Sequence, residues 1–183
     1  FAVDSLDGQS WLNGSARPEE KVGRHEAYER YIVGEVMPFI EERLGEGMPV
    51  LATGCSLGAF HAANFFFRHP DLFDGVIGLS GHYSLRFSLG DSLEGGAYFH
   101  SPLDYLPGLE DPWFLDRYRQ GRLVFCTGQG AWEEDSIRET LALKGILENK
   151  GIPAWVDLWG HDVYHDWPWW QKQMPYFLGK LGY

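Results

Sequence analysis

Short apolar runs that alternate with helix-like segments constrain the fold of this chain more than any other feature. The runs are "PVLAT", "FDGVIGLSG", "RLVFCTG" and "IPAWVDLWG", and each is apolar along its length rather than at every second residue. Strands of this kind are typical of parallel sheets that are covered on both faces. Because helical segments separate the runs, we predict an α/β fold: a mainly parallel sheet with helices on both faces, in a three-layer sandwich.

Local signals set the expected boundaries of several elements. "FAVDS" at residues 1–5 indicates one more strand, and the apolar spacing predicts a helix over 24–44 that Pro38 should kink. Ser136 is followed three residues later by Glu139, which predicts a capping box at the start of another helix.

Residues 84–118 form an irregular segment that is rich in Gly, Pro, Tyr and Trp. The segment is too long for a simple loop, so we predict a lid or pocket wall inserted into the domain. We see no linker and no internal repeat, and 183 residues suit one core. A single domain over residues 1–183 is therefore expected.

The formal net charge of −11 limits the classes of partner. Nucleic acids and anionic membranes are bound by basic surfaces, so we expect neither as a partner. No apolar run reaches the roughly 20 residues of a membrane span, and no secretory signal is visible, although the chain opens with Phe1. Cys55 and Cys126 lie in or beside apolar runs, so we interpret both as buried thiols. A cytoplasmic location is the expectation.

"GCSLG" at residues 54–58 places Ser56 between an expected strand and an expected helix. In this setting G-x-S-x-G makes a sharp turn that presents the serine hydroxyl above the carboxyl edge of the sheet. The flanking glycines keep side chains away, so the backbone can close up at the turn. The helix N-terminus favours negative charge, and the backbone N–H of Leu57 is a candidate oxyanion donor. We predict that Ser56 is a nucleophile.

Two other interpretations of this turn stay open at this point. A glycine-rich turn that a serine merely caps would show the same five residues, and such a pattern also occurs by chance. Cys55 is a rival nucleophile, but it occupies the buried position of the turn rather than its tip.

A nucleophilic serine needs a general base, and the base needs a carboxylate that orients it. Folds with this turn carry the three groups in the order Ser, acid, His along the chain. His161 and His165 both follow the last apolar run, and Glu133, Glu134 and Asp135 follow the run before it.

The choice among these residues rests on competing roles. Acidic residues ahead of a helix also favour its dipole, and Asp135 directly precedes the expected N-cap. We therefore favour Glu133 as the acid, with Asp135 as the alternative. His161 and His165 are four residues apart, a spacing that can bind a metal on a helix. A loop between Gly160 and Pro168 fits the sequence better, so no metal is assigned.

Three longer stretches resemble a known family: "GCSLGAFHAANFFFRHPDLFDGVIGLSG", "YFHSPLDYLPGLEDPWFL" and "HDWPWWQKQMPYFL". They are similar to the putative-esterase branch of the α/β-hydrolases, which includes esterase D-type enzymes and secreted mycolyltransferases. The resemblance covers nearly the whole chain. It implies that the catalytic histidine begins the His-x-Trp-x-x-Trp ending, which is His165 with Trp167 and Trp170, rather than His161. It also implies an acid within "GQGAWEED".

Members of that branch carry further residues before a segment like "FAVDS", and these residues supply early strands and the second oxyanion donor. One such strand lies between the strands that correspond to residues 1–5 and 50–53. We therefore expect that a separate N-terminal polypeptide or a second subunit supplies this strand. Otherwise the two flanking strands pair directly, and the site is incomplete.

Together these features predict a serine hydrolase that cleaves carboxylic esters through an acyl-enzyme on Ser56 and needs no cofactor. The substrate is expected to be a small-molecule ester. Aromatic residues in and near the irregular segment are predicted to line the acyl pocket, although core packing also uses such residues: Tyr83, Tyr98, Phe99, Tyr105 and Trp113. The alternatives are an acyltransferase, or a non-catalytic binding or scaffold subunit with a hydrolase fold.

Overall fold

A computed structural model describes residues 1–45, 47–91, 93 and 96–183. The chain divides into two compact units, one of Phe1–Pro49 with Leu85–Ser101 and one of Val50–Ser84 with Pro102–Tyr183. The predicted lid or pocket wall at 84–118 is thus shared between the two units, and its residues 92, 94 and 95 lie outside the described residues. Its role as a lid stays a prediction.

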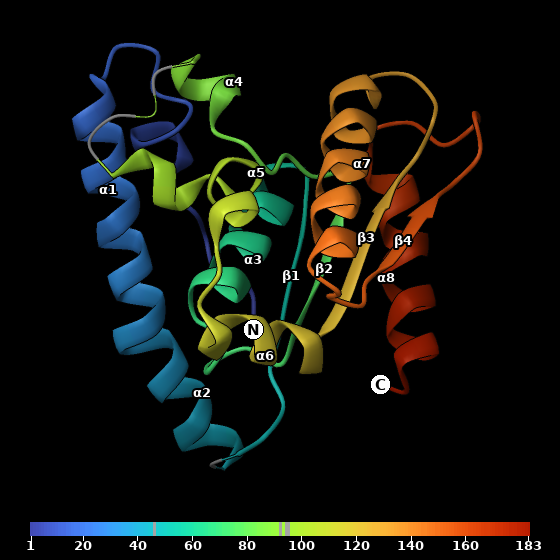
Figure 1. Cartoon of the computed structure of the whole chain (residues 1–183), viewed down its shortest axis with the longest axis horizontal. Coiled ribbons are helices and arrows are strands. Elements are labelled where there is room, and N and C mark those ends of the chain that lie inside the picture. The colour runs from blue at the N-terminus through green and yellow to red at the C-terminus, as the bar shows by residue number, and fades with distance from the viewer. Residues whose placement is uncertain (46, 92, 94–95) are drawn as a thin grey trace. The chain divides into compact units, whose positions relative to one another are not determined.

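Helices make up the regular structure of the first unit (Figure 1). In chain order they are η1 Asp7–Gln9, α1 Pro18–Tyr31, the π-helix η2 Ile32–Val36, α2 Met37–Leu44, α4 Arg86–Leu89 and η3 Ala97–His100. Residues 1–6 have no regular secondary structure, so the strand expected at residues 1–5 is wrong. Direct pairing of such a strand with residues 50–53 is wrong for the same reason.

The first long helix starts earlier than expected and widens where a kink was predicted. It begins at Pro18, and its last turn before Pro38 is π-helical. Proline has no N–H for the carbonyl four residues earlier, and its ring crowds that carbonyl. Inserting a π turn opens the helix at this point, so the chain continues into α2 instead of bending sharply.

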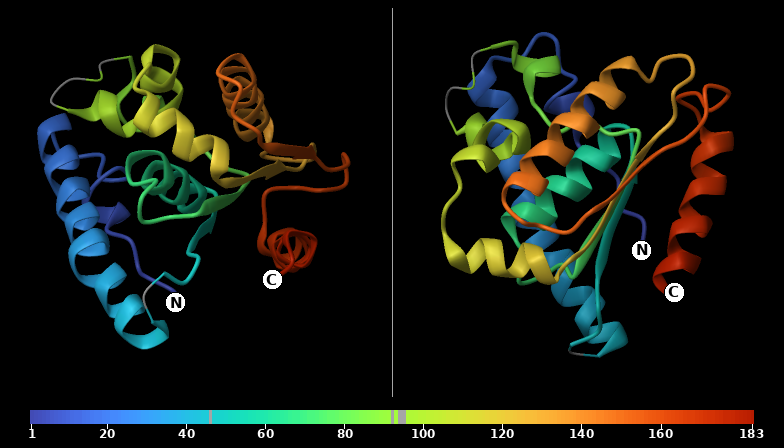
Figure 2. Two further views of the ribbon diagram at one scale, coloured as in Figure 1. Left: turned by 60° about the horizontal axis from the view of Figure 1, so that its bottom comes forward. Right: turned by 45° about the vertical axis from the view of Figure 1, so that its right-hand side comes forward.

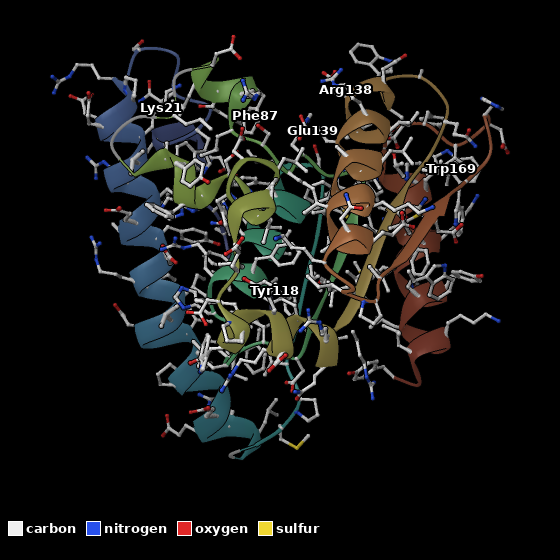
Figure 3. All side chains as sticks on the ribbon, viewed as in Figure 1. Lys21, Phe87, Tyr118, Arg138, Glu139 and Trp169 are labelled. Carbon is white, nitrogen blue, oxygen red and sulfur yellow. The ribbon has the colours of Figure 1, made fainter. Side chains whose placement is uncertain are left out.

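Polar side chains in the interior of the first unit have partners. Trp11 and His25 are buried, and the Trp11 indole N–H donates to His25 Nδ1 over 3.1 Å. Lys21, which Figure 3 labels on α1, donates its ammonium to the carbonyl and hydroxyl oxygens of Ser88 at 3.1 Å. These bonds reduce the cost of burying the polar groups.

The second unit is built on a four-stranded sheet with the strand order β1-β2-β3-β4. The strands are β1 Leu51–Cys55, β2 Gly75–Leu79, β3 Arg122–Thr127 and β4 Trp155–Leu158, and each pairs in parallel with the next. Because all strands run the same way, their carboxyl ends meet at one edge of the sheet. The parallel α/β sheet predicted from the apolar runs is confirmed.

Helices cover both faces of this sheet (Figure 2). α3 Leu57–Arg68, α6 Pro112–Gln120 and α7 Glu134–Asn149 lie on one face, and α8 Trp167–Leu181 lies on the other. Alternate strand residues point to the two layers. Ile77, Leu79, Val124 and Cys126 pack against Trp170 and Phe177 of α8, whereas Phe125 stacks on Phe67 of α3. The three-layer sandwich is therefore confirmed.

The part of segment 84–118 that belongs to the second unit is helical rather than irregular. It forms α5 Pro102–Tyr105, η4 Leu106–Gly108 and α6, whose N-cap Asp111 accepts a hydrogen bond from the Trp113 N–H at 2.8 Å. Prolines stand near the start of each of these elements, where their missing N–H is not needed. The prolines that suggested irregular structure are thus helix-initiating residues.

The outer edge of β1 is the place where the predicted additional strand would pair. Within the described residues β1 pairs with β2 and with no other strand, so the outer edge of β1 has no strand partner there. An unpaired edge presents backbone groups that a further strand can bind.

The packing of α7 gives a test of this layer. Leu143 is fully buried and Leu141 on the same helix is 44% exposed. We expect Leu143→Ala to lower the free energy of unfolding by about 2 to 5 kcal/mol, because it leaves a cavity, and Leu141→Ala by less than about 1 kcal/mol. Urea unfolding measures both values, and equal losses would contradict the assigned orientation of α7.

Candidate active site

Ser56 lies at the junction between β1 and α3, at the carboxyl edge of the sheet. Its φ is 54° and its ψ is −121°, a conformation that costs energy for any residue with a side chain. Its backbone N–H donates to the carbonyl of Leu79 at 2.9 Å, which ties the turn to the end of β2. The strained turn between strand and helix predicted from "GCSLG" is therefore present.

The two glycines of this turn have different reasons to be glycine. A Cβ on Gly54 would lie 2.2 Å from the carbonyl carbon and oxygen of Gly58, so no other residue fits there without a backbone shift. A Cβ on Gly58 would meet no atom within 4 Å. The expectation that both glycines are needed for close approach is right for Gly54 and wrong for Gly58, whose backbone is what Gly54 contacts.

His165 lies in the loop between β4 and α8, and its ring joins the two other predicted residues. His165 Nε2 is 2.9 Å from Ser56 Oγ, and His165 Nδ1 is 3.3 Å from Glu133 Oε2. The next residue, Asp166, caps α8 by accepting the Trp167 N–H at 2.7 Å. The ring of Trp170 stands edge-on to the imidazole, with centroids 5.0 Å apart and an interplanar angle of 87°.

Backbone contacts hold the loop of Glu133 against the loop of His165. The His165 N–H donates to the carbonyl of Ala131 at 3.1 Å, and the Gly130 N–H donates to the carbonyl of Val163 at 2.7 Å. A Cβ on Gly128 would lie 2.1 Å from the Val163 carbonyl oxygen, so this approach requires glycine. The two loops are therefore fixed to each other by main chain.

Glu133 is fully buried, and hydrogen-bond donors reach both of its carboxylate oxygens. Ser80 Oγ donates to Oε1 at 2.7 Å and the Gly128 N–H does so at 3.3 Å. Thr127 Oγ1 donates to Oε2 at 2.9 Å, and this oxygen also faces His165 Nδ1. These donors match the lone pairs of an ionised carboxylate.

The surroundings of Glu133 also set its ionisation. Burial opposes the charge and by itself raises the pKa of Glu133, but hydrogen bonds from His165, Ser80 and Thr127 favour the charged form. The hydrogen bonds prevail, and the pKa of Glu133 lies below its ordinary value of 4.5. Glu133 is thus a carboxylate at neutral pH.

Backbone strain gathers around these residues. Among the described residues, positive φ values outside glycine occur at Ser56 (54°), Ser80 (50°) and Trp132 (71°). Ser56 carries the hydroxyl that faces His165, Ser80 donates to Glu133, and Trp132 directly precedes Glu133. Strained residues cluster where the surrounding structure fixes a functional geometry.

The other carboxylates considered as acids lie elsewhere. Asp135 is exposed in the first turn of α7, where it pairs with Arg138 at 2.7 Å, and Glu134 begins that helix. The predicted capping box is wrong because α7 starts before Ser136. The Ser136 hydroxyl instead donates to the carbonyl of Ser80 at 3.1 Å, and Glu139 accepts the N–H groups of Tyr83 and Ser84. Figure 3 marks Glu139 on α7.

The structure does not bring every predicted residue to Ser56. His161 is exposed in the loop before His165, with Nδ1 3.4 Å from the Gln129 carbonyl oxygen. Tyr83 is fully buried, and its ring packs edge-on against Phe125 of β3. Trp113 lies on α6. This helix leads directly into the start of β3, so it belongs to the amino ends of the strands, whereas Ser56 lies at their carboxyl ends.

Two further aromatic residues of the pocket prediction, Tyr98 and Phe99, belong to the first unit and contact each other edge-on at 5.2 Å. Tyr105 lies in α5 of the second unit and is buried. A pocket role for these residues stays a prediction.

Sequence reasoning missed Ser80, Thr127 and Gly128, which bind Glu133. The sequence does contain a signal for them. They are the polar or glycine residues at the ends of the apolar runs "VIGLS" and "VFCTG". Carboxyl ends of neighbouring parallel strands meet at one edge, so side chains there can converge.

In the described part of the chain, no group of three or more His, Cys, Asp or Glu side chains is placed to hold a metal ion. Nor does any described helix have the length and apolar character to cross a membrane.

The fold is that of the α/β-hydrolases. Residues 4–181 match the sequence pattern of the Putative esterase family, and the chain belongs to this family. No curated protein sequence gives a significant match to the chain.

Solved structures with a similar fold include several hydrolases. A ferulic acid esterase has a TM-score of 0.64 and 21% identity, over 82% of this chain and 59% of that one. An S-formylglutathione hydrolase from Agrobacterium tumefaciens has a TM-score of 0.62 and 15% identity, over 92% and 60%. The fluorophosphonate-binding serine hydrolase F of Staphylococcus aureus has a TM-score of 0.57 and 16% identity, over 85% of this chain and 62% of that one. The chain thus spans about three fifths of these structures, and the likeness shows a shared fold.

The close approach at the turn predicts unequal effects of two matched substitutions. Gly54→Ala should force the backbone apart and lower stability by at least about 2 kcal/mol, whereas Gly58→Ala should change it by less than about 1 kcal/mol. Thermal and urea unfolding measure the difference. Similar values for the two variants would show that the turn does not close as described.

The ionisation of Glu133 predicts how stability depends on pH. Because its pKa is lowered on folding, the carboxylate stabilises the protein above about pH 4.5, and this contribution disappears as pH falls through the lower, folded-state pKa. Glu133→Gln should therefore cost about 1 to 3 kcal/mol at pH 7 and progressively less below pH 4.5.

Exposed Asp135→Asn is the control for this experiment. At pH 7 it should change stability by less than about 0.5 kcal/mol. Urea titrations between pH 3 and pH 7 measure the three curves. A constant difference between wild type and Glu133→Gln across this range would contradict the lowered pKa.

Proposed function

We propose that the protein is a serine hydrolase that cleaves carboxylic esters through an acyl-enzyme on Ser56. The observation that carries this proposal is the continuous line of contacts from Ser56 Oγ to His165 Nε2 at 2.9 Å and from His165 Nδ1 to Glu133 Oε2 at 3.3 Å. The order Ser, His, Glu in space is that of a nucleophile, its base and the acid that orients the base. Membership of the Putative esterase family supports the same reaction class.

In the proposed acylation, Ser56 Oγ bonds to the ester carbonyl carbon while His165 Nε2 takes the hydroxyl proton. The tetrahedral intermediate carries its negative charge on the former carbonyl oxygen. When the bond to the alcohol oxygen breaks, His165 gives the proton to that oxygen and the alcohol leaves. Water then repeats the sequence on the acyl-enzyme and releases the carboxylic acid and free Ser56.

Glu133 serves this cycle by holding His165 in one tautomer. A carboxylate at Nδ1 requires the proton on that nitrogen, which leaves Nε2 free to accept from Ser56. Because Glu133 is ionised at neutral pH, it also stabilises the imidazolium that forms in each half-reaction.

The oxyanion is stabilised at the start of α3. The N–H of Leu57 opens the first turn of this helix, where backbone N–H groups have no acceptor within the helix, and the helix dipole favours negative charge. We further propose that a segment that pairs with the outer edge of β1, from a separate N-terminal polypeptide or a second subunit, supplies the second donor. The unpaired edge in the described sheet supports this part of the proposal.

The rival thiol Cys55 is a poor nucleophile in this environment. Burial raises the pKa of Cys55 to about 11, so the thiol stays protonated at neutral pH. Cys55 is therefore a suitable control position beside Ser56.

A fluorophosphonate probe tests the proposed nucleophile. We expect wild type and Cys55→Ala to be labelled and Ser56→Ala to remain unlabelled, since His165 Nε2 lies 2.9 Å from Ser56 Oγ and can take its proton. Hydrolysis of p-nitrophenyl acetate should fall by at least about 1000-fold in Ser56→Ala. Gel fluorescence and intact mass measure the labelling. An unlabelled wild type would favour the scaffold alternative, and labelling of Ser56→Ala would refute the assignment.

A further inference from the structure

We propose that Trp170 is a positioning residue for the active site, because its indole N–H directs the hydroxyl proton of Ser80 onto Glu133. This inference rests on the proposed function, in which Glu133 orients His165. Trp170 Nε1 is 3.0 Å from Ser80 Oγ, and Ser80 Oγ is 2.7 Å from Glu133 Oε1. The three side chains are buried, so water does not substitute freely for these contacts.

The direction of the two hydrogen bonds follows from the chemistry of the groups. An indole N–H can only donate, so Ser80 Oγ must be the acceptor of the first bond. A serine hydroxyl has one proton, and an ionised carboxylate can only accept. The Ser80 proton therefore points to Glu133 Oε1, and the indole occupies the side of the oxygen to which that proton could otherwise turn.

Ser80 is the firmest of the donors to Glu133. The Gly128 N–H is 3.3 Å from Oε1, and the Thr127 hydroxyl has a second acceptor in the Gly128 carbonyl at 3.2 Å. Without the Ser80 proton, only the long bond from Gly128 would restrain Oε1. The carboxylate could then rotate, and its alignment with His165 Nδ1 would loosen.

Trp170 also contacts the base directly, through the edge-on packing of its ring against the imidazole of His165. One side chain thus packs against the base and, through Ser80, orients the acid. α8 holds it in place, because Trp170 and Phe177 of this helix pack on Ile77 and Val124 of the sheet. This gives the last Trp of the His-x-Trp-x-x-Trp pattern a role that its size alone does not explain.

The neighbouring tryptophan provides a matched control. Trp169, which Figure 3 labels on α8, has a buried indole N–H that meets no hydrogen-bond partner in the described part of the chain. Trp169→Phe and Trp170→Phe therefore make the same chemical change on adjacent residues. Only the second removes a hydrogen bond to Ser80, and both keep an aromatic ring.

Fluorophosphonate labelling and p-nitrophenyl acetate hydrolysis are the activity readouts. We expect Trp170→Phe and Ser80→Ala each to slow Ser56 labelling by about 10-fold, with kcat reduced and KM unchanged, and Trp169→Phe to stay within about twofold of wild type. Because the indole N–H that Trp170→Phe removes acts through Ser80, the double variant should lose little more than Ser80→Ala alone.

A readout without turnover separates this inference from the proposed function. The NMR resonance of the His165 Nδ1 proton reports its hydrogen bond to Glu133. It should move in Trp170→Phe and Ser80→Ala and stay in place in Trp169→Phe, whether or not the wild type is labelled. An unlabelled wild type with these resonance shifts would defeat the proposed function alone. Equal effects of the two Trp variants, or additive losses in the double variant, would overturn the positioning role.

Discussion

A buried carboxylate persists in a protein only when donors surround it, and Glu133 is the group on which the organisation of this site depends. Its donors lie at or beyond the carboxyl ends of β2, β3 and β4: Ser80, Thr127 with Gly128, and His165. The charge therefore ties neighbouring strand ends together at the sheet edge. Removing a partner would leave a buried charge or donor unsatisfied, which is costly. The same bonds that hold the loops also fix His165 toward Ser56.

α7 extends this arrangement to the loop after β2. Glu133 directly precedes the helix, the Ser136 hydroxyl donates to the Ser80 carbonyl, and the carboxylate of Glu139 accepts two backbone N–H groups of the same loop. The buried face of α7 is therefore polar at its start and apolar further along, at Leu143 and Leu147. One helix face thus both packs on the sheet and holds the loop whose Ser80 hydroxyl binds the Glu133 carboxylate.

Much of this could be predicted from the sequence, because strong local patterns determined it. Continuous apolar runs marked all four strands, and the glycine-serine turn marked Ser56. The geometry around Glu133 could not be predicted in the same way, since Ser80 and Trp170 lie 90 positions apart and meet only through the stacking of α8 on the sheet. Two predictions failed because a local signal has more than one structural meaning. The Ser136–Glu139 pattern predicted a capping box, but both side chains bind the loop after β2. The prolines of segment 84–118 suggested irregular structure, but in the second unit they begin helices.

The spacing of the site residues along the chain has a consequence for how the protein folds. Ser56 and His165 are 109 positions apart, and the contact between them needs the sheet to be complete from β1 to β4. Contacts of such long range form late, because loop closure must precede them. The strained backbone at Ser56 likewise gains support only from neighbours that are already in place. A partly folded chain can therefore hold most of its helices before Ser56 Oγ meets His165 Nε2, so this contact marks the last stage of folding rather than collapse.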